Sequence, residues 1–474
     1  MLKYNFQYEW LLLIRNRWIQ VLTILLLILF GFAVYNGTQK VDARTSNIAE
    51  AINEFKTEEK EMLAQLDSID KGFEVNASSW LVPTRPIVIG NLHPRVVNMP
   101  SKSTAFVATG QSDLFAHYVQ PIVTGDDSTM SFKEMTSPVQ LLFGSFDLAF
   151  VIVYLLPLLI IAFSFNILAS ERESGSLKLL ASQPIDIRVW VLQKLGLRFF
   201  WLVIAIIITL SLVFIVFGFD FKTGFMSFVA LLSIVIAYAL FWFVLAFATN
   251  IWIRSSAKNA ITLIGFWILF VLLSPSLINQ ISNSLYPIPS RTLMLNEMRS
   301  IKAEATKKQD EILDNFLRDH PEYATNDSTQ VRGFYQKYMA TQQLIQDELK
   351  PLLSEFEAQI SNQHRLVNAS SWLSPALIVQ NALNSIAGTS TEDYQDFKRQ
   401  SLAFSKEWRN FFKPMLFKDS TFSKSDYKNL PEFEFSYAAV NIYSKTLGLL
   451  FLNSLILFLI LALKPSKHQA ELIG

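Results

Sequence analysis

The chain has 474 residues, of which 51% are hydrophobic and only 17% are charged, and its mean hydropathy is +0.30. Soluble proteins carry about 25% charged residues, so this composition indicates an integral membrane protein. The formal net charge of +1 gives no overall attraction to nucleic acid. The absence of cysteine excludes disulfides, thiolate catalysis and cysteine-ligated zinc sites.

Six hydrophobic runs are long enough to cross a bilayer, which takes about 20 apolar residues. They cover approximately residues 18–35, 146–168, 196–219, 225–251, 260–281 and 444–463. The first run lacks a small-residue cleavage site, so we interpret it as a retained span. Pro157 predicts a kink in the second run. The expected fold class is therefore an all-α membrane protein with six transmembrane helices.

Charge in the short loops predicts the orientation of these spans. Residues 1–17, 169–195, 252–259 and 464–474 fall on one side if all six runs span, and they are rich in lysine and arginine. The short loop on the other side, 220–224, holds only Lys222. Because positive loops stay inside, we expect a multi-pass protein of the inner (plasma) membrane with both termini in the cytoplasm.

The expected organisation then has five parts. Residues 1–38 form the cytoplasmic N-terminus and first span, and 39–145 form a first extracytoplasmic domain. Residues 146–281 form a four-span core with the cytoplasmic loop 169–195, and 282–443 form a second extracytoplasmic domain. Residues 444–474 provide the sixth span and a cytoplasmic tail.

Both extracytoplasmic insertions are expected to be mainly helical. Apolar residues recur in them at spacings of three and four, which predicts helices that bury one stripe in a core. The stripes are Ile48, Ile52, Phe55, Met62, Leu66 and Ile69; then Met294, Met298, Ile301, Ala305, Ile312 and Phe316; then Ile345, Leu349, Leu352 and Phe356. Pro351 is expected to disturb the third stripe.

A short repeat links the two insertions. Residues 75–83 read V-N-A-S-S-W-L-V-P and residues 367–375 read V-N-A-S-S-W-L-S-P, so the copies differ at one position. Repeats mark duplicated structural units. We predict that Trp80 and Trp372 are buried anchors at equivalent corners, and that Pro83 and Pro375 end the element. A shared ligand-binding role and glycosylation at the Asn-x-Ser tripeptides are the alternatives.

Sequence signatures of catalysis are missing. The chain contains no G-x-x-x-x-G-K-[ST], H-E-x-x-H or G-x-S-x-G string. His93 and His117 share a methionine-containing region, which leaves a soft-metal site as an alternative, but the wide spacing favours no metal site. We therefore expect neither an enzyme nor a cofactor bound by this chain. Asp147, at the outer end of the second run, is expected to cap that helix or to reach toward water.

The most distinctive stretch lies between the second and third runs. Residues 168–194 read L-A-S-E-R-E-S-G-S-L-K-L-L-A-S-Q-P-I-D-I-R-V-W-V-L-Q-K. Hydrocarbon cannot accommodate this density of charge, so the stretch is expected in water at a membrane face. Gly175 allows a turn that other residues resist, and Pro184 stops any helix before it. An ordinary polar loop is the alternative.

The string E-R-E-x-G-S-L-x-L-L-x-S-Q-P resembles the segment after the second span of type-2 ABC transporter permeases, an exporter-like class with a separate ATPase subunit. Residues 110–114, 144–147, 154–158 and 372–388 are similar to the subgroup with large extracytoplasmic insertions. The resemblance implies two permeases, either two copies of this chain or this chain with a related permease, on two ATPase subunits, which use ATP and magnesium. It also implies a gate role for Asp147 and Pro157.

In the family, the charged segment docks on the nucleotide-binding subunit. We accordingly expect Glu171, Arg172 and Glu173 to form hydrogen bonds with the ATPase. Leu177 and Leu180 are expected to fill an apolar groove of that partner.

Two functional hypotheses follow from the sequence. The first is a permease subunit that moves an unidentified substrate, driven by ATP hydrolysis in its partner. The second is a non-transporting membrane protein whose extracytoplasmic domains bind an envelope component or a partner protein. An ATP-binding subunit that co-purifies with the chain would distinguish the first hypothesis from the second.

Overall fold

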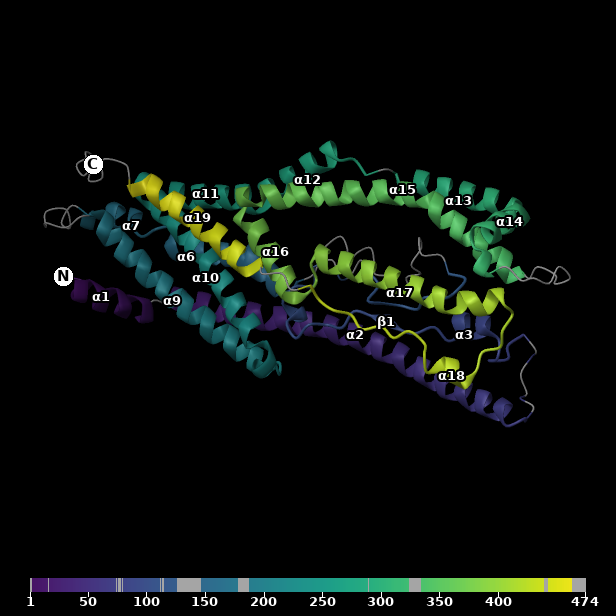
Figure 1. The fold of residues 1–474 in the computed structure, drawn as a ribbon. Coiled ribbons are helices and arrows are strands. Elements are labelled where there is room, and N and C mark those ends of the chain that lie inside the picture. The colour runs from purple at the N-terminus through teal and green to yellow at the C-terminus, as the bar shows by residue number, and fades with distance from the viewer. Residues whose placement is uncertain are drawn as a thin grey trace.

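The structure, a computed structural model, describes residues 2–15, 17–73, 75, 78, 80–110, 112, 115–125, 146–177, 187–288, 290–323, 334–438 and 442–462. Nearly all of the regular structure in these residues is helical; strands β1 (Val97–Asn98) and β2 (Tyr118–Val119) form one short antiparallel pair. The molecule is elongated, with a helical bundle at one end and a second body, here called the head, at the other (Figure 1).

Five helices or helical runs in the described residues are long and apolar enough to cross a membrane. They are α2 (Arg17–Asp70); the run of α5 (Leu148–Phe150), η3 (Val151–Leu155), α6 (Leu156–Ser164) and α7 (Ala169–Glu173); α9 (Ile187–Val216); α10 (Phe221–Trp252); and the run of α11 (Ser256–Trp267), η4 (Ile268–Leu273) and α12 (Ser274–Leu285). The chain is thus a helical protein of membrane type.

Two further helices pack on this bundle. Helix α1 (Leu2–Arg15) contacts α9, and α19 (Ile442–Ala462) packs along α10. Helix α19 corresponds to the last predicted span, and its apolar stretch, Thr446–Leu459, is shorter than those of the other five. A sixth span therefore stays a prediction.

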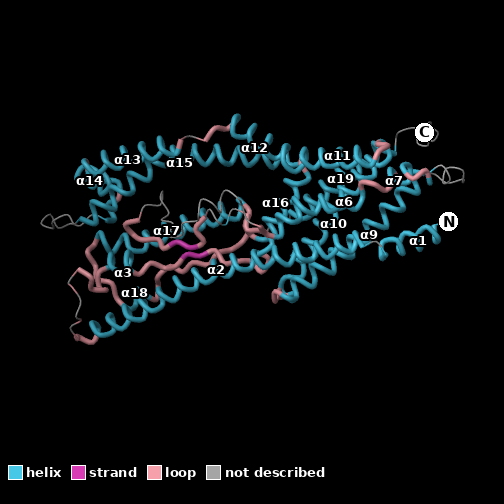
Figure 2. The backbone as a smooth tube through the Cα atoms, turned by 180° about the vertical axis from the view of Figure 1, so that it is seen from behind, coloured by secondary structure: helices cyan, strands magenta, loops and turns pink. Residues whose placement is uncertain are grey.

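Helix α2 joins the bundle to the head without a break. The sequence suggested a span at 18–35 and a separate amphipathic helix at 44–70, whereas the structure has one helix of 54 residues. At about 1.5 Å per residue this helix is about 80 Å long. Its first half exposes apolar side chains such as Ile24 and Ile28, and its second half buries a stripe that includes Met62 and Leu66. Helix α2 runs unbroken from the bundle along the head (Figure 2).

The head also contains α3 (Pro86–Leu92), α13 (Arg291–Lys307), α14 (Gln309–Asp319), η5 (Pro321–Tyr323), α15 (Phe334–Ser370), α17 (Thr391–Phe417) and α18 (Lys424–Tyr427). Both long polar regions contribute to its single apolar core. The indole Nε1 of Trp408 donates to the Gly90 carbonyl oxygen at 3.1 Å, and the Phe422 amide donates to the Thr84 carbonyl oxygen at 2.7 Å. The two regions therefore fold together into one body.

The three apolar stripes predicted from the sequence are confirmed as core faces. The residues that are less than a tenth exposed are Ile48, Phe55, Met62 and Leu66 on α2, Met298, Ala305, Ile312 and Phe316 on α13 and α14, and Ile345 and Leu349 on α15. Helix α15 continues through Pro351, which lies on its exposed side. The proline therefore does not end the helix.

A neck joins the two bodies, and we define it as residues 99–109, which include η1 (Ala105–Val107), together with η6 (Ser371–Leu373) and α16 (Pro375–Ala387). Although α16 lies in the second polar region, its buried face belongs to the core of the bundle. Phe106 joins the same core from the first polar region. Its carbonyl oxygen lies so close to α2 that a Cβ on Gly37 would be 2.1 Å away, so only glycine fits there.

Candidate functional site

The charged triplet at 171–173 lies on α7, at the end of the bundle farthest from the head (Figure 1). Arg172 Nη1 donates to the carbonyl oxygen of Ile253, just beyond the end of α10, at 3.2 Å. Glu173 accepts from the backbone amide of Ser256 at 2.8 Å and from its hydroxyl at 3.0 Å. Ser256 is the first residue of α11. A cation therefore meets the negative end of one helix and a carboxylate meets the positive end of the next.

Glu171 takes part in a second set of contacts, centred on Lys194 of α9. Lys194 Nζ lies 3.0 Å from Glu171 Oε1 and 2.8 Å from Glu9 Oε1 on α1, and it also lies 4.1 Å from the centre of the Trp190 ring. Lys194 and Glu9 are both less than a tenth exposed. The hydroxyl of Ser176 donates to the other carboxylate oxygen of Glu171. This cluster joins α1, α7 and α9 around one nearly buried ammonium group.

A break in the second apolar run lies immediately before the triplet. Between α6 and α7 the chain forms turns, and the carbonyl groups of 163–165 accept hydrogen bonds from Arg198 on α9, Asn250 on α10 and Asn259 on α11. The side-chain Oδ1 of Asn250 also accepts from the backbone amide of Leu168, at 3.2 Å. Backbone groups in an apolar layer need internal partners, so these side chains make the break possible.

Sequence reasoning missed these supporting residues. Asn250 stands at the end of a long apolar run, where a single amide is a signal that a backbone group elsewhere needs a partner. Lys194 was noted only as part of the positive charge of the loop. Glu9 lies in a helix that the sequence analysis did not distinguish from a polar terminus.

Gly175 and Leu177 give opposite outcomes. Gly175 has a φ of 75°, so the predicted turn that favours glycine is confirmed. Leu177 is 2% exposed and packs in the bundle's own core, so the expectation that it lies on the surface to fill a partner's groove is wrong. The apolar side chain of Leu177 packs within its own chain and is not available to a partner. Leu180 and Pro184 lie outside the described residues.

The exposed surface of this element is small and polar. Ser170, Glu173, Ser174 and Gly175 are exposed, whereas Glu171 and Arg172 are partly buried. The triplet therefore joins the ends of helices within the chain and presents one carboxylate outward. We refer to α7 and residues 174–177 as the E-R-E element.

Asp147 lies at the opposite end of the same apolar run and caps its first helix. One carboxylate oxygen accepts from the Phe150 amide at 2.8 Å, and the other accepts from the amide of Thr109 at 2.8 Å and from its hydroxyl at 2.9 Å. Asp147 is 6% exposed. Its side chain thus caps a helix of the bundle and holds the neck to it; its role in a gate stays a prediction.

Pro157 follows a wide helical turn, and the predicted kink stays a prediction. The π-helix η3 precedes Pro157, and the Val153 carbonyl, which would have paired with an amide at position 157, accepts instead from the Tyr238 hydroxyl at 3.0 Å. The Tyr154 carbonyl accepts from the indole of Trp267 at 3.0 Å. A gate role for Pro157 likewise stays a prediction.

The two copies of the repeat differ in structure. In the second copy residues 367–370 end α15, and Pro375 begins α16, whereas in the first copy Val75 and Ser78 are not helical. The prediction of buried tryptophans at equivalent corners is wrong, because Trp80 is 64% exposed and Trp372 is 56% exposed. The two copies have different neighbours, so a nearly identical sequence does not give identical packing.

Both prolines of the repeat are buried, as are Ser371 and Ser374 of the second copy. Pro83 lies in a turn before α3, and Pro375 opens α16 instead of ending an element. The differing position explains part of the contrast. Ser374 accepts from the Leu377 amide at 3.3 Å and donates to the Phe270 carbonyl of η4 at 2.7 Å. Val82, its counterpart, has no group that can do either.

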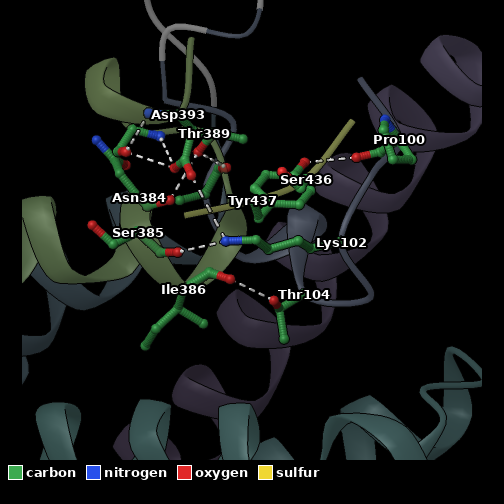
Figure 3. Close-up of polar contacts among 12 residues, drawn as sticks. Pro100, Lys102, Thr104, Asn384, Ser385, Ile386, Thr389, Asp393, Ser436 and Tyr437 are labelled. Carbon is green, nitrogen blue, oxygen red and sulfur yellow. Dashed lines mark hydrogen bonds and ion pairs between the residues drawn. The ribbon is translucent and has the colours of Figure 1, made fainter. Parts of the chain in front are cut away.

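Polar contacts close the end of α16 (Figure 3). Lys102 Nζ lies 3.4 Å from the Ser385 carbonyl oxygen and 3.8 Å from Asp393 Oδ1, and the Thr104 hydroxyl donates to the Ile386 carbonyl oxygen at 2.6 Å. Carbonyl groups in the last turn of a helix have no partner within it. The first polar region therefore supplies the partners for a helix of the second.

The soft-metal alternative gains no support from the described residues, in which no group of three His, Asp or Glu side chains is placed to hold a metal ion. His117 is buried against Tyr394, with ring centres 6.0 Å apart. His93 lies partly buried, with Nδ1 3.9 Å from a carboxylate oxygen of Glu58. The two histidines thus occupy different surroundings.

A family model described as a domain of unknown function (DUF3526) matches residues 291–436. This segment contains α13 to α18 and covers the part of the head and neck contributed by the second polar region. No curated protein and no solved structure matches the chain.

Proposed function

We propose that this chain is the membrane-spanning permease subunit of an ABC transporter. It moves a substrate across the plasma membrane, driven by ATP and magnesium in a separate nucleotide-binding subunit. The observation that carries the proposal is the set of contacts of the E-R-E element. This element is bonded to α9, α10 and α11 at one face of the bundle, and its sequence resembles the ATPase-docking segment of type-2 ABC permeases.

The topology of the bundle supports this proposal. Helix α1, the E-R-E element and the C-terminal end of α19 lie at the same end of the molecule (Figure 1). That end carries the positively charged loops, so we place it in the cytoplasm with both termini. Helix α19 then serves as the sixth span, and the head lies outside the membrane.

Coupling requires an element whose position a partner can bias. An ATPase that docks on the exposed Glu173 and Ser174 competes for the carboxylate that caps α11. Movement of α7 then reaches α10 through Arg172 and α9 through Glu171. The turns at 165–168 separate α7 from the rest of its span, so α7 can shift without moving the whole run.

The test is reconstitution of the chain with the ATP-binding subunit that co-purifies with it. Glu171→Lys combined with Glu173→Lys is expected to reduce transport-coupled ATP turnover at least tenfold. Glu61→Lys, at an exposed position of the head, is the matched charge control and should leave turnover unchanged. Unaltered turnover in the double variant would remove the coupling role. If native preparations contain no ATP-binding subunit, the alternative of a non-transporting protein with a partner-binding head is favoured.

A further inference from the structure

A cavity of about 460 Å³ opens at the junction of bundle and head, remote from the E-R-E element. Its walls come from α12, α15, α16, the start of α17 and α19. The volume lies within the range of small-molecule sites, about 300–1,000 Å³. Five carboxamide side chains line it, which is an unusual concentration of one chemical group: Asn279, Gln363, Asn368, Asn381 and Asn384.

The remaining lining is mixed and carries little charge, and its aliphatic members are Ile360, Val367, Ile378 and Leu449. Six serine or threonine side chains contribute hydroxyl groups, and Glu392 and His364 are the ionisable members. None of the described residues that line the cavity is lysine, arginine or an aromatic residue. A phosphate or carboxylate ligand would therefore find no lysine or arginine, and a quaternary ammonium would find no Phe, Tyr or Trp face.

Hydrogen bonds fix the orientation of the amides before any ligand binds. Asn381 Nδ2 on α16 donates to Asn368 Oδ1 on α15 at 3.3 Å, and Asn368 Nδ2 donates to Glu392 Oε1 on α17 at 3.2 Å. Gln363 Nε2 donates to the Tyr286 carbonyl oxygen at 2.6 Å, which ties α15 to the end of α12. Such preorganisation lowers the entropic cost of binding.

We propose that this cavity binds an uncharged, polyhydroxylated group, a glycosyl unit. A carboxamide presents a donor and an acceptor in one plane, and each hydroxyl of a sugar is also both donor and acceptor. Neighbouring sugar hydroxyls thus match the amides, while the absence of lysine and arginine from the described lining disfavours anions. A peptide backbone also pairs with carboxamides, but the five amides here come from three different helices, α12, α15 and α16, which suits a ligand with hydroxyls on several sides better than an extended strand.

The same chemistry could come from a free saccharide or from the headgroup of a glycolipid. The cavity includes Leu449 of α19, and exposed apolar side chains such as Leu277 and Ile281 lie on α12. A lipid-borne sugar could therefore reach the cavity from the side. This inference does not depend on ATP coupling, because binding is measured on the chain alone.

The experiment uses the full-length protein in phosphatidylcholine nanodiscs, with empty nanodiscs as the blank. Saturation-transfer NMR titrations compare maltose, hexyl maltoside, hexylphosphocholine and inorganic phosphate. Saturable binding of maltose and hexyl maltoside with equal affinity supports a free saccharide. Binding of hexyl maltoside about tenfold more tightly than maltose supports a glycolipid. Hexylphosphocholine controls for the alkyl tail, and phosphate controls for anions.

Two sets of variants locate the site. Asn368→Leu with Asn381→Leu should weaken saccharide binding about tenfold or more, because partners of the sugar hydroxyls are lost. Asn279→Leu, on an exposed position of α12, should weaken it about threefold even if the double variant does not fold. Asn283→Leu, exposed one turn away and outside the lining, is the matched control and should bind as the native chain does.

Three results would overturn the proposal. The first is the lack of saturable binding by either saccharide to folded protein. The second is tighter binding of phosphate or hexylphosphocholine than of the saccharides. The third is equal saccharide affinity in Asn279→Leu and Asn283→Leu.

Discussion

The two ends of the second apolar run use carboxylates in different ways. At the head end, Asp147 is 6% exposed, and its hydrogen bonds go to its own helix and to the neck. At the other end, Glu173 is exposed and bonds to the first residue of α11. A buried carboxylate with every contact internal fixes a helix, whereas an exposed one can exchange its partner. Changes at the head end should therefore alter stability, and changes at the E-R-E end should alter coupling.

Among the changes that test this contrast, the largest effect is expected from Asp147→Ala. This substitution removes a helix cap and leaves the buried amide of Thr109 without its acceptor, which should lower the free energy of unfolding by about 2–4 kcal/mol. Asp147→Asn keeps one acceptor and should cost less. Denaturant unfolding in detergent measures both. Native stability in Asp147→Ala would show that the head end is not fixed in this way.

Ser374→Val extends the comparison to the neck, because it gives the second copy of the repeat the residue of the first. Loss of the cap and of the bond to Phe270 should cost about 2 kcal/mol. The reciprocal change, Val82→Ser, is the matched control, and we expect little change from it. Equal thermal unfolding midpoints for the two variants would argue against a special role for this position.

The head should also lose stability in mild acid. Burial lowers the pKa of His117 from its ordinary value of 6.5 to about 3, and the nearby Arg44 acts in the same direction. Between these values the unfolded chain binds the proton more strongly, so the contribution is complete above pH 6.5 and is lost as the pH falls toward 3. From pH 7 to pH 5 the expected loss is about 2 kcal/mol.

Unfolding at pH 7, 6 and 5 in the native chain and in His117→Gln measures this contribution. The variant should show a shallower decline. Burial also lowers the pKa of His93, which acts in the same direction and remains in both proteins. Parallel declines in the two proteins would exclude His117 as the source.

A smaller effect on stability is expected at the E-R-E end. Glu173→Gln removes an exposed charge, and exposed ionic contacts are worth about 0–1 kcal/mol. ATP turnover with the partner should nevertheless fall severalfold, because the charged cap of α11 is lost. A large loss of stability without a change in turnover would reverse the contrast between the two ends.

The smallest effects are expected at the tryptophans of the repeat. Trp80→Ala and Trp372→Ala should each change stability by no more than about 0.5 kcal/mol, because both side chains are mostly exposed. Trp408→Ala, which removes a fully buried indole of the head, is the positive control and should cost about 3–5 kcal/mol. Thermal unfolding of the three variants in one detergent measures these changes, and a loss for either repeat tryptophan as large as that for Trp408→Ala would contradict the prediction.

Periodicity and hydropathy predicted much of this architecture, because they report on one helix at a time. The stripe with Met62 and Leu66, and the apolar runs around α9 and α10, lie where the pattern placed them. The same patterns did not predict whether two neighbouring helical segments form one continuous helix. Nothing in residues 36–43 signals whether a span and an amphipathic helix are one helix, because both patterns are helical.

The contacts of the site depend on which helices meet, and that information is not local. Glu173 and Ser256 lie 83 positions apart, and Asn250 serves a carbonyl group 86 positions away. The string E-R-E marked the element as special without showing that its charges face the chain itself. Leu177 was likewise predicted to dock on a partner, because the sequence around it does not reveal that it lies in the apolar core of the bundle.

The most direct test of the account is whether the E-R-E element contacts an ATP-binding subunit. The chain has no cysteine, so Ser174→Cys can carry a thiol-directed photo-crosslinker at an exposed site of this element. Glu61→Cys places the same reagent on the head. In membranes that contain the native complex, we predict that illumination joins Ser174→Cys, but not Glu61→Cys, to an ATP-binding subunit. No such product from Ser174→Cys, or the product from Glu61→Cys alone, would contradict the proposed docking and the coupling that depends on it.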